Sequence, residues 1–171
     1  GHSRGAIYGD VLANLLMFNG NTVTKEYYIN DYGNQIINFT ESVFLRLREI
    51  KFKEKFKDKE NLYPGDYVID IAQKILSDIP EIDLTDFKKI FSKISKLSLK
   101  QSMILIKNDL EALGISHDNF VSEKSLVEKD LVSKSIKYLQ DKKFVEEGYL
   151  NPPKGDEYKK WKKTKRLIFK S

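Results

Sequence analysis

The first 55 residues alternate between helical and strand patterns, and this alternation constrains the fold more than any other feature. In residues 4–18 apolar side chains recur at helical spacing, namely Ile7, Val11, Leu12, Leu15 and Phe18. Residues 22–29 are rich in β-branched and aromatic side chains and predict a strand. A polar turn at 30–35 leads into a second predicted helix at 35–55. Helix and strand in this order predict an α/β fold.

The middle of the chain is predicted to be mainly helical. Residues 83–113 alternate apolar and lysine positions at helical period and predict two helices, closed by Gly114. Ser3 is expected to cap the first helix of the chain, and Asn19-Gly20 to close it. The remaining predicted elements are a helix at 66–78 stopped by Pro80, a strand at 119–122, a helix at 126–142, and strands at 144–149 and 167–169.

Composition excludes several classes of protein and site. The 171 residues are 40% hydrophobic and 32% charged, which is typical of a soluble globular protein with a real core. No apolar run approaches the ~18–20 residues that a membrane span needs, so no membrane partner is expected. The absence of cysteine excludes disulfides, thiolate zinc sites and cysteine nucleophiles, and it allows a cytoplasmic location.

The net charge of +5 is unevenly placed along the chain. Residues 151–171 hold eight basic residues and two acids, so the rest of the chain is close to neutral. This basic tail could contact a polyanion such as RNA, through Lys159, Lys160, Lys162 and Lys163. A solvated surface is the favoured explanation, since only four of the thirty basic residues are arginine.

The chain opens on Gly1-His2-Ser3-Arg4-Gly5, a turn suited to holding phosphate at the start of a helix. Backbone N–H groups at a helix N-terminus attract anions, and glycine lets the backbone approach them closely. The His2 imidazole could donate a hydrogen bond to a phosphate oxygen, and Arg4 could add a positive charge. A cloning remnant would also explain a Gly-His-Ser start.

A second polar cluster, residues 30–35, follows the predicted strand at its carboxyl end, where open α/β sheets bind ligands. Asp31 could pair with an amino group, and Gln35 could donate and accept hydrogen bonds. A plain Asn/Asp/Gly turn leading into the next helix is the alternative. His117-Asp118 has no neighbouring histidine or cysteine, so we expect a surface or structural pair and no metal site. Trp161 is expected to anchor the tail, with base stacking as the alternative.

Residues 1–10, Gly-His-Ser-Arg-Gly-Ala-Ile-Tyr-Gly-Asp, resemble the second half of the His-x-Gly-His signature of class I aminoacyl-tRNA synthetases. Residues 23–36, Val-Thr-Lys-Glu-Tyr-Tyr-Ile-Asn-Asp-Tyr-Gly-Asn-Gln-Ile, resemble arginyl-tRNA synthetases in particular. Weaker colinear similarities continue to the end of the chain, at 62–67, 109–126, 147–155 and 167–171.

This resemblance implies that the parent enzyme converts arginine and ATP to arginyl-adenylate and pyrophosphate, and then transfers the arginyl group to the 3′ end of an arginine-specific tRNA. ATP with magnesium would be its substrate, and no side chain would form a covalent intermediate. The catalytic residue would be His2, with Gly1, His2 and Arg4 at the ATP phosphates. Arginine would bind at His2, Asp31, Gly33 and Gln35.

The resemblance also implies a partial Rossmann-like catalytic domain with a mainly helical insertion. Residues 1–49 would belong to the nucleotide-binding part, 50–125 to the insertion and 126–171 to the return with its basic tail. The first histidine of the signature would precede residue 1, and the Lys-Met-Ser-Lys-Ser loop would follow residue 171. We therefore expect an inactive internal piece of a monomeric enzyme. The alternative from another class is a freestanding helical RNA-binding module that uses the tail.

Overall fold

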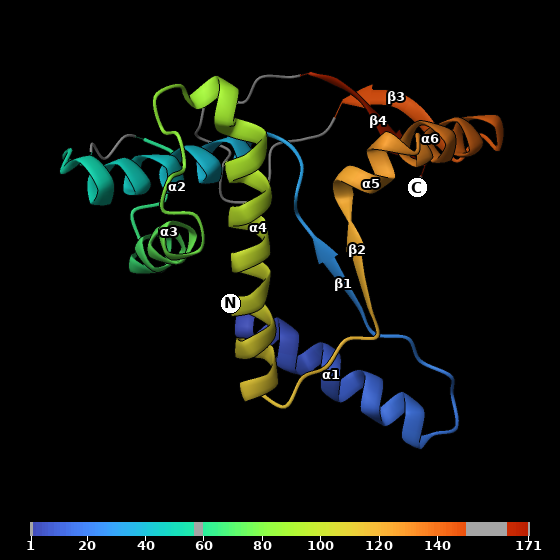
Figure 1. Ribbon diagram of the computed structural model, residues 1–171. Coiled ribbons are helices and arrows are strands. Elements are labelled where there is room, and N and C mark those ends of the chain that lie inside the picture. Colours follow the sequence, from blue (N-terminus) through green and yellow to red (C-terminus); the bar gives the residue numbers. More distant parts are fainter. Residues whose placement is uncertain (1, 57–59, 150–163, 171) are drawn as a thin grey trace, which may run out of the picture. The chain divides into compact units, whose positions relative to one another are not determined.

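The computed structural model describes residues 2–56, 60–149 and 164–170, and its helices and strands are drawn in Figure 1. The chain forms two compact units. The first unit is Gly1–Glu123 and the second is Lys124–Ser171. Helices and strands both occur, as the α/β prediction requires. The first unit contains α1 (His2–Phe18), β1 (Glu26–Ile29), α2 (Asn34–Phe52), α3 (Asp66–Asp78), α4 (Phe87–Ala112) and β2 (Asn119–Ser122).

Helices α2, α3 and α4 pack together and supply most of the core of the first unit. Each contributes apolar residues at helical spacing, so each buries one stripe against the other two. The buried apolar residues of this cluster are Phe39, Val43, Phe44, Leu47, Val68, Ile71, Ala72, Ile75, Ile82, Leu84 and Ile94.

Helix α4 is a single helix of 26 residues, so the prediction of two helices over 83–113 was wrong. No glycine or proline interrupts its sequence, and nothing local therefore ends it early. The Asp86 carboxylate caps its start by accepting hydrogen bonds from the Lys88 and Lys89 backbone N–H groups. Gly114 follows its end with φ +72°, as predicted for a left-handed closing residue.

Strands β1 and β2 form a parallel pair in which Glu26 lies opposite Asn119 and Ile29 lies opposite Ser122. The strand predicted at 22–29 is shorter, because only its second half pairs with β2. A parallel pair needs a long crossover between its strands, and here α2, α3 and α4 provide it. The fold is thus a mixed helix and strand arrangement. The Rossmann-like assignment and the predicted domain boundaries stay predictions.

Helix α1 confirms the helix predicted at 4–18, but its apolar stripe is not buried within the first unit. Val11 is 50% exposed and Phe18 is 91% exposed, whereas Ala13 is buried. The helix begins at His2, so Ser3 lies inside it and the prediction that Ser3 caps it was wrong. Gly20 has φ +85° just after the helix, as predicted.

The second unit contains the last two strands, β3 (Val145–Tyr149) and β4 (Lys165–Phe169), which pair antiparallel as a two-stranded sheet. Helix α5 (Glu123–Glu128) starts at the boundary between the units, and α6 (Leu131–Asp141) follows it. The single helix predicted at 126–142 was therefore wrong, because Asp130 adopts a left-handed conformation, φ +56°, between the two helices. Within the described residues, no helix combines the length and apolar character that a membrane span requires.

Candidate functional site

The carboxyl ends of β1 and β2 meet at one edge of the parallel pair and bring together residues far apart in sequence. Asp31 follows β1, and Ser122 ends β2. The Ser122 hydroxyl donates a hydrogen bond of 2.6 Å to the Asp31 carboxylate, which joins positions 91 residues apart. The register Ile29 opposite Ser122 makes this contact possible, because it aligns the two strand ends.

A second carboxylate lies at the same edge. Glu123 follows Ser122 directly and accepts a hydrogen bond from the Tyr28 side chain on β1. This hydrogen bond, with a further contribution from burial, raises the pKa of the Tyr28 hydroxyl above its ordinary value. Asp31 adds to the same shift through its negative charge. Two carboxylates at one strand edge favour a cationic ligand, such as an ammonium group.

An amide pair borders this edge. The Asn30 side chain donates a hydrogen bond of 2.8 Å to the Gln35 side-chain carbonyl. Each primary amide has two N–H groups and one carbonyl, so the pair can still donate and accept toward a ligand. Both side chains line a pocket of about 190 Å³ that also reaches Tyr63 and Tyr67. The predicted role of Gln35 as donor and acceptor is thus compatible with its position.

Gly33 makes the turn that directs α2 away from this edge. Its φ of +87° and ψ of −171° lie in a region that only glycine adopts readily. The Gly33 carbonyl accepts a hydrogen bond of 3.2 Å from the Ile36 N–H at the start of α2. Gly33 therefore shapes the backbone between Asp31 and Gln35, which explains a glycine here without any ligand contact.

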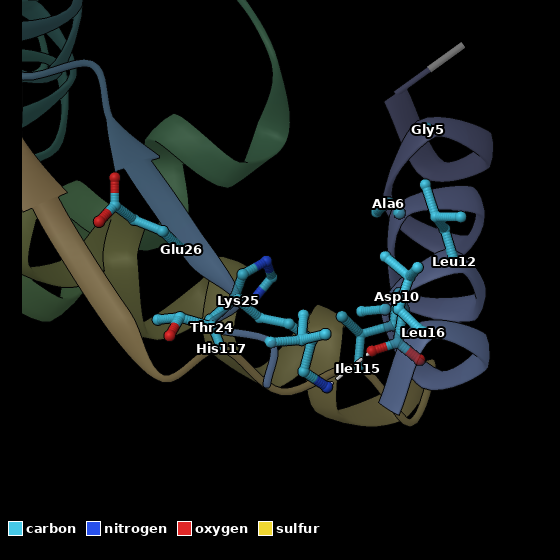
Figure 2. Close-up of a pocket in the computed structure, with 13 residues that line it drawn as sticks. Gly5, Ala6, Asp10, Leu12, Leu16, Thr24, Lys25, Glu26, Ile115 and His117 are labelled. Carbon is cyan, nitrogen blue, oxygen red and sulfur yellow. Dashed lines mark hydrogen bonds and ion pairs between the residues drawn. The ribbon is translucent and has the colours of Figure 1, made fainter. Parts of the chain in front are cut away.

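Lys25 joins three segments of the first unit at the opposite end of β1. Its ammonium group lies 2.9 Å from the Asp10 carboxylate on α1, and both side chains are largely buried. Its backbone N–H donates to the Asp118 carboxylate at 2.6 Å, and its carbonyl accepts from the Asp118 N–H at 2.8 Å. Figure 2 shows the Lys25 side chain extending to α1 across a pocket of about 360 Å³. This contact ties α1 to the strand pair.

His117 and Asp118 have structural contacts, as predicted for this pair. The His117 ring packs edge-on against Tyr27 at 5.4 Å between ring centroids and also contacts Phe120. Asp118 binds the Lys25 backbone. Among the described residues, no group of three or more histidine, aspartate or glutamate side chains is placed to hold a metal ion.

The Asp10–Lys25 ion pair should be visible as a pH-dependent contribution to stability. The hydrogen bond and charge of Lys25 lower the pKa of Asp10 below its ordinary value of 3.8. A lowered folded-state pKa stabilises the fold above that ordinary value, and the stabilisation is lost as the pH falls through the folded pKa. Lys25→Met should therefore raise the pKa of Asp10, measured by carbon-13 NMR titration of its carboxyl group.

The matched control for this titration is Lys74→Met. Lys74 forms an exposed ion pair with Asp78 at 2.8 Å on α3, and its removal should leave the Asp10 pKa where it was. An Asp10 pKa that does not move in Lys25→Met would contradict the importance of the ion pair.

The predicted site residues are only partly placed by the structure. Asp31, Gly33 and Gln35 lie together at the strand edge, and Arg4 is exposed on α1. Gly1 and the side chain of His2 lie outside the described residues. So do Trp161 and the tail lysines Lys159, Lys160, Lys162 and Lys163.

The sequence did not identify Tyr28, Ser122 and Glu123 as residues of the strand edge. It also did not predict the ion pair between Asp10 and Lys25, which links α1 to the strand pair. The predicted strand at 119–122 could have indicated Ser122 and Glu123 as site residues. Had it been paired in parallel with the first strand, Ser122 and Glu123 would have been expected beside Asp31.

The chain is similar in sequence to arginine–tRNA ligases. No protein-family model matches it. It is 48% identical over 172 residues to an arginine–tRNA ligase of Pelagibacter ubique and 44% identical over 175 residues to that of Ehrlichia chaffeensis. Each similarity covers 100% of this chain and 30% of the relative, so the chain spans less than a third of these proteins.

A solved structure is similar as well. A Campylobacter jejuni protein, provisionally described as an arginyl-tRNA synthetase, aligns with a TM-score of 0.76 and 28% identity. The alignment covers 99% of this chain and 37% of that one. These similarities confirm the family resemblance predicted from the sequence.

Proposed function

We propose that this chain, which is similar over its whole length to a segment of arginine–tRNA ligases, forms part of the catalytic region of such an enzyme. The parent enzyme would activate arginine with ATP and transfer it to tRNA. The observation that carries the proposal is colinear similarity across the entire chain at 48% identity. The acidic strand edge supports the proposal, because its carboxylates suit a cationic substrate such as arginine.

Arginine would bind at the edge formed by Asp31 and Glu123. Its ammonium group is a cation, and the hydrogen bond from Ser122 holds the Asp31 carboxylate in place. Gln35 would add neutral hydrogen bonds, and Gly33 would set the backbone between them. These residues position a substrate and neutralise its charge, which suits a reaction that needs no covalent intermediate.

ATP would bind with its phosphates toward the start of α1, where Gly1, His2 and Arg4 precede or begin the helix. The positive end of a helix dipole, an arginine and a histidine all suit phosphate oxygens. The carboxylate of arginine would attack the α-phosphate of bound ATP, which forms arginyl-adenylate and releases pyrophosphate. Magnesium would bind with the ATP, whose phosphate oxygens are its usual ligands.

The test is a chimera in which residues 1–171 replace the matching segment of the Pelagibacter ubique relative. The chimera should charge arginine-specific tRNA with arginine and catalyse arginine-dependent ATP–pyrophosphate exchange in the presence of tRNA. The isolated 171-residue chain should show no exchange. A folded chimera that charges no tRNA would contradict the proposed function, and exchange by the isolated chain would contradict the role as part of a larger site.

A freestanding RNA-binding module that uses the basic tail remains the alternative from another class. Its lysines, at 159–163, lie outside the described residues, and no contact of the described residues favours it. The cytoplasmic location and the monomeric state of the parent enzyme also stay predictions.

A further inference from the structure

Five lysines form a stripe along one face of α4. Their spacing of four, three, four and seven residues matches the helical repeat of 3.6, so all five project from the same side. Every one of them is exposed. At a rise of ~1.5 Å per residue the stripe is about 27 Å long. Its members are Lys89, Lys93, Lys96, Lys100 and Lys107.

The sign of the charge along α4 is uniform. Residues 87–108 hold six lysines and no acid, although the whole chain has 30 basic and 25 acidic residues. A helix face that is merely solvated usually mixes both signs, which gives favourable pairs at spacings of three and four. In three consecutive like-charge pairs, from Lys89 through Lys100, the charges instead repel one another.

The stripe faces away from the core. The opposite side of α4 packs on α2 and α3, and Ile94 and Ser98 on that side are fully buried. Figure 1 shows the C-terminal half of α4 running on past both helices. Among the described residues, the stripe forms one ion pair, Lys89 with Asp86 at 3.9 Å, where the Lys89 side chain is 86% exposed. At the other end, the Lys107 ammonium group lies 4.2 Å from the centroid of the Phe120 ring on β2.

We infer that this α4 lysine stripe binds the phosphate backbone of tRNA. A row of like charges on a rigid helix is complementary to a partner with regularly repeated negative charge, and a nucleic acid backbone has that property. A membrane surface fits less well, because the apolar residues in the first half of α4, Ile90, Ile94 and Leu97, pack in the core and cannot enter lipid. The choice of tRNA as the RNA rests on the proposed function.

Direct binding tests the stripe without any enzymatic activity. Lys93→Gln, Lys96→Gln and Lys100→Gln together should weaken binding of an arginine tRNA transcript to the 171-residue chain about tenfold at low salt. The slope of log affinity against log salt should fall by about 2, since each lost phosphate contact removes ~0.7–0.9. The matched control changes three exposed lysines of the second unit, Lys129, Lys134 and Lys137, to glutamine. Equal slopes for the two triple variants would overturn the inference.

Two further measurements keep the result interpretable. Glutamine has nearly the helix propensity of lysine, so the stripe variant should keep its circular dichroism spectrum and melt no earlier than the unsubstituted chain. Vesicles of phosphatidylserine and phosphatidylcholine provide the membrane arm. Loss of vesicle binding with unchanged tRNA binding would overturn the inference in favour of a membrane surface.

The chimera separates this inference from the proposed function. In a chimera that charges tRNA, the stripe variant should raise KM for tRNA about tenfold, while KM for arginine and kcat stay within about twofold. An active chimera whose stripe variant has an unchanged KM for tRNA would refute the stripe and leave the proposed function intact. An inactive chimera would refute the proposed function, and the salt slope of the 171-residue chain would still decide the stripe.

Discussion

Asp31→Asn in the chimeric ligase should lower kcat/KM for arginine about 10- to 100-fold. The change removes one negative charge and keeps the size of the side chain. A hydrogen bond to a charged group contributes about 1.5–3 kcal/mol, which corresponds to a factor of about 10 to 100 in affinity. The asparagine carbonyl can still accept from Ser122, so the strand edge should keep its geometry. Steady-state kinetics at saturating ATP and tRNA measure the effect.

Asp70→Asn is the matched control for this substitution. Asp70 is an exposed aspartate on α3, away from the strand edge, and kcat/KM for arginine should stay within about twofold. Ser122→Ala should fall between the two variants, because it removes the neutral hydroxyl that positions the Asp31 carboxylate. Wild-type kinetics for arginine in Asp31→Asn would remove Asp31 from the arginine site.

Local chemistry made several elements predictable from the sequence. Helix α3 lies at 66–78, as predicted, because a Pro-Gly break precedes it and Pro80 follows it. Strand β2 lies at 119–122, as predicted, because a short apolar centre is bounded by polar residues. Gly114 ends α4 in the left-handed conformation that glycine favours. In each case, the deciding residues lie within a few positions of the element.

The pairing of distant segments was not predictable in the same way. Ser122 and Asp31 are 91 positions apart, and their contact depends on the parallel register of β1 and β2. The apolar stripe of α1 shows a related difficulty. Periodicity identified which face is apolar, but it carries no information about what covers that face, and Val11 is exposed within the first unit. The turn at Asp130 separates α5 from α6, although no glycine or proline there predicts a turn.

The core of α2, α3 and α4 also explains what holds the edge of the β1–β2 pair in place. The crossover from β1 to β2 consists of α2, α3 and α4, so the packing of these helices fixes where the second strand returns. Asp31 and Glu123 lie at the same strand edge only if that crossover is folded. Stability of the core and the geometry of the candidate arginine site are therefore expected to be coupled.

Ile94→Ala tests the core directly and should destabilise the first unit by about 3 kcal/mol. Ile94 is fully buried on α4 between α2 and α3, and truncating a buried isoleucine costs about 2–5 kcal/mol through lost burial and the cavity left behind. Ile104→Ala on the same helix is the matched control, because Ile104 is 43% exposed and its truncation should cost under ~0.5 kcal/mol. Native-state hydrogen exchange of the amides in α2, α3 and α4 measures both effects.

Which amides lose protection in Ile94→Ala is as informative as how much protection they lose. If the three helices form one cooperative core, Ile94→Ala should lower the free energy of opening by the same amount in α2, α3 and α4. The β1–β2 amides should lose protection with them, because the crossover holds these strands in register. A loss confined to α4, or equal effects of the two isoleucine substitutions, would show that α4 is not part of a shared core. The strand edge would then need another source of support.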